Sequence, residues 1–283
     1  MLRIFKYELR RRRNKIFIFG GTMAGLSLGT LILLLFKQNA IGAVLMRTGG
    51  TEGLWYSLTV FALIFIPMVM FFTCSNGHVD ELLYKDTNYL MLTIPIRSEA
   101  ILGGRLLAGF VEFSIYAVIA SFFGLIFLAW GSSFASSMMS NEVGFSFALS
   151  TIMRGLFIDN ILPVLYFFFS SLAGFLVVGT GFMFVKALTR SFIRRKTLAQ
   201  ILAVVAFVFI FYWLIRLGSY LSVQLDLVQS LDLRLFSFNG EAEGVFKEVK
   251  PMDIHLVTTI MLFLVAAGFF VLTSRLFDKK VEL

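Results

Sequence analysis

Six long apolar stretches divide the chain, and no other feature constrains its fold as strongly. A helix of twenty residues, at about 1.5 Å per residue, covers the roughly 30 Å hydrocarbon core of a bilayer. Lipid offers no hydrogen-bond partner to backbone N–H and C=O groups, and the stretches lack the period-two alternation of barrel strands. We therefore predict six transmembrane α-helices, at residues 16–36, 54–73, 106–130, 161–185, 198–217 and 254–276.

The composition indicates the same class of protein. Hydrophobic residues make up 58% of the 283 residues and charged residues only 15%, against roughly 45–50% and about 25% in soluble domains. A soluble core cannot hide this excess, so the bilayer must be the solvent for much of the surface. We expect an all-α integral membrane protein with a single transmembrane domain over residues 1–283.

The basic residues predict the orientation in the membrane. Most of the 25 Lys and Arg residues lie in four segments that six spans place on one side, which the positive-inside rule makes the cytoplasmic side. Both termini are therefore expected in the cytoplasm, with the chain in the plasma membrane of a bacterial-type cell. The net charge of +8 follows this sidedness and does not indicate nucleic-acid binding. The first apolar stretch is too long for a secretory signal, whose apolar region has about 7–15 residues.

Residues 1–15 predict an amphipathic helix on the cytoplasmic membrane surface. Leu2, Phe5 and Leu9 follow helical spacing, and basic residues take the remaining face. Basic groups at anionic headgroups and apolar groups at the acyl boundary are typical of interfacial helices. The alternative is that these basic residues act only as a topology signal.

Glycines recur along one face of the first span. Gly21, Gly25 and Gly29 form two consecutive GxxxG steps, a spacing that lets another helix approach closely in lipid. The partner is either a helix of the same chain or a second protomer. The same stretch imitates a phosphate-binding loop, but Leu26 stands where that motif needs its lysine and no strand precedes it, so we reject ATP binding by this chain.

The segment of residues 75–105, between the second and third spans, carries more charged residues and more apolar patterning than a short connection needs. Acidic residues open the segment, Leu90, Leu92 and Ile94 alternate along it, and Pro95 interrupts it. This pattern favours a structured element that contacts a partner at the cytoplasmic face. A plain interfacial helix and turn is the alternative.

The segment from Glu81 to Leu107 resembles the cytoplasmic loop of ABC-2-type ABC transporter permeases. In that family an acidic stretch and a short YLxLTLP run precede ILxGKLLA, which opens the third helix. The corresponding stretches here are YLMLTIPIRS at residues 89–98 and ILGGRLLA at residues 101–108. The start of the chain, with FKYEL at residues 5–9 ahead of a basic run, and the six-span layout are similar as well.

The resemblance implies the transmembrane permease subunit of an ATP-driven exporter. Its cytoplasmic loop, residues 75–105, would act as a coupling helix seated on a separate cytoplasmic ABC ATPase, which would bind ATP and Mg and hydrolyse the ATP. Two permeases, as a homodimer or with a related permease, would form the translocation path with two ATPases. The resemblance implies as ATPase-coupling residues Glu81, Tyr84, Asp86, Tyr89, Leu92, Pro95 and Arg97.

Glu112 is a carboxylate inside the third span, seven residues beyond Arg105. Intramembrane carboxylates are costly, and they are functional candidates for that reason. Glu112 either lies at a polar site on the substrate path or pairs with Arg105 or another basic residue of the inner end.

The outer segment at residues 218–253 predicts an amphipathic helix between the fifth and sixth spans. Leu225, Val228, Leu231 and Leu235 follow helical spacing with charged residues between them, which fits a helix on or within the outer membrane surface. This arrangement resembles that of ABC-2 permeases, which use such helices to cap the exit of the translocation path.

Other function classes have less support in the sequence. A proton- or ion-coupled secondary transporter would want several ionisable groups near the midplane, where Glu112 stands alone. An enzyme is not expected, because the chain has only two histidines and one cysteine, and no HExxH or GxSxG motif. We expect this chain to bind no metal or cofactor. A non-transporting sensor or immunity protein stays open. The Phe-rich spans suit an amphipathic peptide or hydrophobic cargo, and Phe that simply faces lipid is the ordinary explanation.

Overall fold

The computed structural model describes residues 2–36, 51–76, 97–138, 144–193, 195–235 and 248–280. Within these ranges lie seven α-helices, one π-helical turn and a two-stranded sheet. The helices are α1 (Leu2–Phe36), α3 (Thr51–Ser75), α6 (Ser98–Met138), α7 (Phe145–Arg154), α8 (Ile161–Phe192), α9 (Lys196–Gln224) and α10 (Leu256–Lys280). The π-helical turn η2 (Gly155–Asp159) joins α7 to α8, and the strands are β1 (Val228–Leu235) and β2 (Glu248–His255).

Six of the described helices, all except α7, are long and apolar enough to cross a bilayer by length and composition. The prediction of a multi-pass helical membrane protein is therefore confirmed. The first five of these six spanning helices contain their predicted spans, and the sixth, α10, begins at Leu256 instead of residue 254. Pro67 lies inside α3, which continues past it to Ser75.

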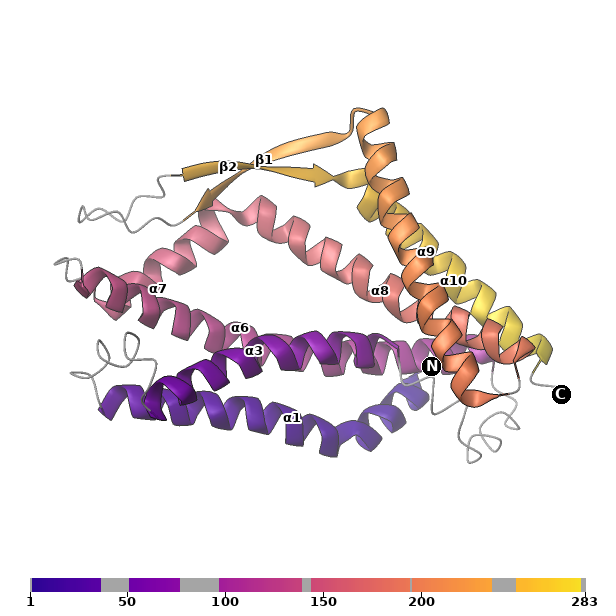
Figure 1. Cartoon of the computed structure of the whole chain (residues 1–283), viewed down its shortest axis with the longest axis horizontal. Helices are drawn as coiled ribbons and strands as arrows, with labels where there is room; N and C mark the ends of the chain where they lie inside the picture. The colour runs from indigo at the N-terminus through magenta and orange to yellow at the C-terminus, as the bar shows by residue number, and fades with distance from the viewer. Residues whose placement is uncertain are drawn as a thin grey trace.

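The spans form two groups, seen in Figure 1. Helices α1, α3 and α6 lie side by side along one edge, and α8, α9 and α10 diverge from them. The start of α1 and the end of α10 lie where the two groups meet. We call this the inner end of the bundle and the opposite end the outer end.

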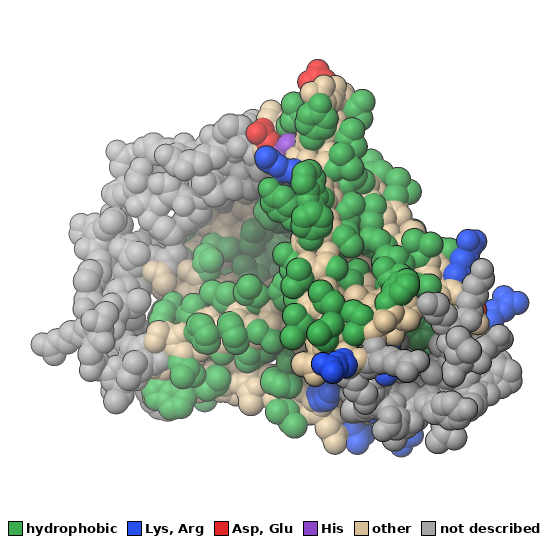
Figure 2. Space-filling model, turned by 45° about the vertical axis from the view of Figure 1, so that its right-hand side comes forward, with side chains coloured by type: hydrophobic (Ala, Val, Ile, Leu, Met, Phe, Trp, Pro, Cys, Tyr) green, Lys and Arg blue, Asp and Glu red, His purple; other side chains and the backbone are tan. Residues whose placement is uncertain are grey.

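Helix α1 joins the predicted surface helix to the first span without a break. The segment at residues 1–15 is therefore not a separate interfacial helix within the described residues. Basic side chains, among them Arg3, Lys6, Arg10 and Arg13, are exposed along its first turns. Figure 2 shows most of the visible Lys and Arg side chains toward the lower right, with a broad hydrophobic surface beyond them.

The predicted amphipathic helix within residues 218–253 is wrong for the described residues of that segment, most of which form two strands. Helix α9 ends at Gln224, and β1 and β2 then form an antiparallel hairpin in which Val228 faces His255 and Leu235 faces Glu248. The sequence of β1, VQSLDLRL, alternates leucines with charged residues over its second half, which is the period-two signal of a strand. The helix was predicted from apolar residues spaced three or four positions apart, and that spacing masked the shorter period of the strand.

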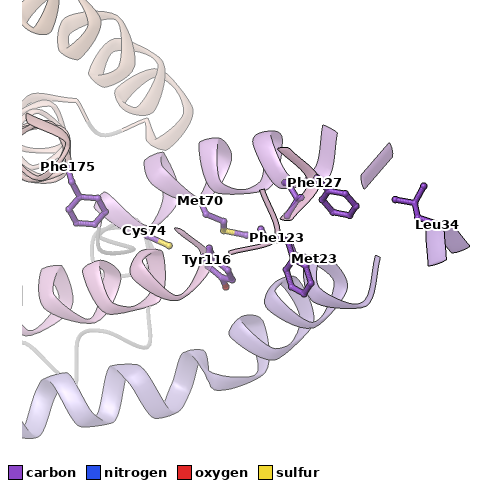
Figure 3. Close-up of a cluster of buried hydrophobic side chains, with 9 residues drawn as sticks. Met23, Leu34, Met70, Cys74, Tyr116, Phe123, Phe127 and Phe175 are labelled. Carbon is purple, nitrogen blue, oxygen red and sulfur yellow. The ribbon is translucent and has the colours of Figure 1, made fainter. Parts of the chain in front are cut away.

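The apolar core that positions the inner end lies between α1, α3 and α6, with Phe175 reaching in from α8. Figure 3 shows this cluster, in which Met23, Cys74 and Tyr116 are fully buried. Phe175 stacks on Phe113 of α6, with ring centroids 5.5 Å apart. These contacts hold the two helix groups together next to the inner end.

Candidate functional site at the inner end

Four charged side chains are buried together between α1 and α6. Glu8 and Arg12 belong to α1, Arg105 and Glu112 belong to α6, and none is more than 2% exposed. We call these four residues the buried charge cluster. Charged side chains are almost never fully buried unless they are paired, so their pairing is the central question.

Each member of the buried charge cluster meets a partner of opposite sign. Arg12 Nη1 lies 3.2 Å from Glu112 Oε2, and Arg105 Nε lies 3.2 Å from Glu8 Oε1. Arg12 Nε also lies 3.8 Å from Glu8 Oε2. Arg11, whose side chain is 34% exposed, reaches Glu8 from the rim, with Nη2 2.9 Å from Oε2. The four charges thus form a continuous chain of opposite signs from Arg105 to Glu112.

The spacing of α1 explains why two charges point inward. Glu8 and Arg12 lie one helical turn apart, on the face that continues through the buried residues Met23 and Ser27. Two carboxylates and two guanidinium groups balance in charge. Removing one member of such a buried pair costs about 3–5 kcal/mol, because the other charge is left without compensation.

The cluster continues into the apolar core through Tyr116. The Tyr116 hydroxyl, fully buried, donates a hydrogen bond to Glu112 Oε1 at 3.4 Å, one helical turn along α6. Glu112 is therefore held by two groups, a guanidinium from α1 and a phenol from its own helix.

Two glycines let the inner end of α3 come into backbone contact with neighbouring helices. A Cβ at Gly109 of α6 would lie 2.0 Å from the carbonyl oxygen of Cys74, and a Cβ at Gly179 of α8 would lie 2.3 Å from that of Ser75. The same point at Gly109 lies 3.5 Å from Arg12 Nη1. The Arg12 cation thus sits beside the carbonyl end of α3, where the helix dipole favours positive charge.

The first turns of α6 are fixed by the last turns of α10. The Ser98 hydroxyl donates to the Ser274 carbonyl oxygen at 3.2 Å, lies 3.1 Å from the Ser274 hydroxyl and hydrogen-bonds Asp278 Oδ1. Ile101 and Leu102 beyond it are buried against Met183 of α8 and against α10. Both helices that flank residues 77–96 are therefore built into one packed junction.

The predicted coupling residues Glu81, Tyr84, Asp86, Tyr89, Leu92 and Pro95 lie outside the described residues. Arg97 is described and exposed, directly before α6. Its carbonyl oxygen accepts hydrogen bonds from the backbone N–H groups of Ala100 and Ile101. Its side chain is thus placed at the surface of the inner end.

Gly21, Gly25 and Gly29 face away from the described helices. A Cβ at any of the three would meet no atom within 4 Å. Among the described residues, no helix of this chain packs on this stripe, so the predicted partner helix within the same chain is not found there.

The sequence predicted that Glu112 lies on a substrate path or pairs with Arg105 or another basic residue of the inner end, and the structure gives it such a basic partner, which the sequence did not single out. Glu112 pairs with Arg12, and Arg105 pairs with Glu8. The available signal was Glu8, a single acid among seven basic residues in the first fifteen, one turn before Arg12. Gly109 and Gly179 were missed as well, because a lone glycine in an apolar stretch carries no signal of close approach.

The six spans and the buried charges define the chain as a multi-pass α-helical membrane protein. Among the described residues, no group of three or more His, Cys, Asp or Glu side chains is placed to hold a metal ion. Comparison of the chain with protein-family models, with curated proteins and with solved structures gives no match.

Proposed function

We propose that this chain is the transmembrane permease subunit of an ATP-driven exporter of the ABC-2 type. Its cytoplasmic loop receives the movement of a separate ABC ATPase, which binds and hydrolyses the ATP. The observation that supports this proposal is the junction described above, because both ends of the loop enter it directly. Helix α3 ends there at Ser75 and α6 begins there at Ser98.

Such a junction suits the transmission of force from a cytoplasmic loop to several spans. The carbonyl of Cys74 lies against α6 and that of Ser75 against α8. Ser98 of α6 is hydrogen-bonded to α10, and the buried charge cluster connects α6 to α1. A displacement of the loop therefore acts on four neighbouring helices through backbone contacts and buried ion pairs. Closely packed helices deform little, so they move as whole bodies.

The geometry of Glu112 counts against the secondary-transporter alternative. A proton- or ion-coupled carrier needs a carboxylate that can take up and release its ion near the midplane. Glu112 instead contacts the Arg12 guanidinium at 3.2 Å and accepts a hydrogen bond from Tyr116. An ion would have to displace both groups.

We propose that two permease copies, or this chain and a related permease, line the translocation path. Within the single chain, only 17–28% of the most apolar window of each span is buried. The remaining surface is free for lipid and for a second subunit. Phenylalanines on α8 such as Phe167, Phe168 and Phe169 are about half exposed, and we propose an amphipathic peptide or hydrophobic compound as the cargo.

The test is copurification of the full chain with an ABC ATPase from the same cells, followed by measurement of ATP hydrolysis in nanodiscs. The variant Glu81→Ala/Tyr89→Ala removes two proposed coupling side chains. We expect this variant to lose the ATPase, or to leave its hydrolysis unresponsive to the permease. A matched control is Glu241→Ala/Glu243→Ala, in the segment between β1 and β2, which should retain the full complex.

If the chain purifies folded and without an ATPase under conditions that preserve the membrane complex, the exporter proposal fails. The hypothesis of a non-transporting sensor or immunity protein is then better supported. Equal ATPase binding and hydrolysis in both variants would contradict the assigned coupling residues.

A further inference from the structure

Helices α1 and α6 run parallel and contact each other in a consistent order. Starting from the inner end, Glu8 meets Arg105 and Arg12 meets Glu112. Further out, a Cβ at Gly20 would lie 3.3 Å from Ile119 Cδ1. The same two helices share one apolar cluster beyond that point.

The order of signs along these two helices is opposite. From the inner end outward, α1 presents an acid at Glu8 and then a base at Arg12, whereas α6 presents a base at Arg105 and then an acid at Glu112. Only the observed register brings unlike charges together at both positions.

A slide of one turn, about 5.4 Å, brings like charges together in either direction. Because Glu8 and Arg12 are one turn apart, an outward slide of α1 puts Glu8 in the place of Arg12, opposite Glu112. An inward slide puts Arg12 in the place of Glu8, opposite Arg105. Unpaired like charges buried together are strongly unfavourable.

Apolar packing between α1 and α6 distinguishes the observed register from the shifted ones less strongly than the charges do. The contacts beyond the cluster are made by apolar or small residues such as Met23, Gly20 and Ile119, and in lipid such contacts are driven by close packing alone. Fixing the register of packed helices is the best-attested role of buried polar groups.

We propose that the buried charge cluster locks the register of α1 against α6, so that the two helices shift as one unit. The first span, with its exposed basic turns at the inner end, then follows every movement of the third span. This holds for the chain itself and does not depend on a partner ATPase.

The test uses oxidative cross-linking of the full chain in native membranes, in a Cys74→Ala background that removes the one native cysteine. Gly20→Cys is combined with Ile119→Cys to report the observed register. It is combined instead with Phe123→Cys to report an outward slide of one turn, or with Ile115→Cys to report an inward slide. With the native charges we expect the Ile119 pair to dominate by about tenfold or more, equivalent to about 1.4 kcal/mol.

The decisive variant reverses the charges of α1 alone, as Glu8→Arg/Arg12→Glu. Like charges then meet in the observed register, and a slide in either direction brings unlike charges together. We expect cross-linking to move to the Phe123 or the Ile115 pair, or the chain to be lost from the membrane. The full reversal, which adds Arg105→Glu/Glu112→Arg, restores every pair within the cluster and should return cross-linking to Ile119.

Two results would overturn the proposal. One is native cross-linking at Ile119 in the chain reversed on α1 alone. The other is failure of the full reversal to restore folding and the Ile119 product. Because the assay needs only this chain in a membrane, its outcome is separate from that of the ATPase experiment.

Discussion

Replacing Gly109 with alanine tests the backbone contact between α6 and the end of α3. The added Cβ would lie 2.0 Å from the Cys74 carbonyl oxygen and 3.0 Å from its carbonyl carbon. Both atoms belong to the backbone, so no side-chain rotation can relieve the clash. The matched control is Gly124→Ala on the same helix, where a Cβ meets nothing within 4 Å.

The magnitude follows from the size of the clash and the gain in helix propensity. Observed Cβ contacts essentially never fall below 3.0 Å, so the two helices must separate by about 1 Å. Overpacking of this kind costs about 1–3 kcal/mol, and a backbone clash belongs at the upper end. Glycine to alanine within a helix returns up to about 1 kcal/mol. We expect a net loss of about 2 kcal/mol for Gly109→Ala and a gain of up to about 1 kcal/mol for Gly124→Ala.

The native Cys74 is a reporter at the site of the change, because it is fully buried and is the one cysteine of the chain. Labelling by a thiol reagent requires the packed junction to open, so its rate tracks the free energy of that opening. A difference of about 3 kcal/mol between the two variants corresponds to a labelling ratio on the order of 100-fold. Equal labelling rates, with equal survival on heating in detergent, would refute the reasoning.

Three further tests address separate features of the structure. Glu112→Leu alone should lower stability by about 3–5 kcal/mol, whereas Arg12→Met/Glu112→Leu should recover most of the loss; thermal survival in detergent would show this, and an equally damaged double variant would contradict it. Thr59→Val removes the 2.6 Å hydroxyl contact with Thr30 that joins α3 to α1 and should cost about 0.6 kcal/mol, a shift that the midpoint of a denaturant titration would detect. Asp226 has a φ of 53° after the end of α9, so Asp226→Gly should stabilise the chain by up to about 1 kcal/mol, and a lower melting temperature would count against this.

The spans were predictable because their signal is composition over twenty residues, which no tertiary contact overrides in a bilayer. The hairpin was not, because Leu225, Val228, Leu231 and Leu235 fit a helical spacing as well as the alternation in β1 fits a strand. In the structure the pairing of β1 with β2 decides between them. That pairing joins residues far apart in the sequence, so a local period cannot reveal it.

The buried charge cluster was predictable only in part, for a different reason. The positive-inside rule already accounts for every basic residue before the first span, so Arg12 gave no reason to look for a buried partner. Its role depends on the rotation of α1, which sets Glu8 and Arg12 inward and leaves Arg13 exposed. Packing against α6 and α3 determines that rotation.

The paired charges also limit how this sequence can change over time. A single substitution at Arg12 or Glu112 strands the other charge, whereas an exchange of both signs preserves the contact. Descendants of this chain should therefore vary at these two positions together, and at Glu8 and Arg105 together. Variation at Gly109 should be nearly absent, because a backbone contact offers no second position that can compensate.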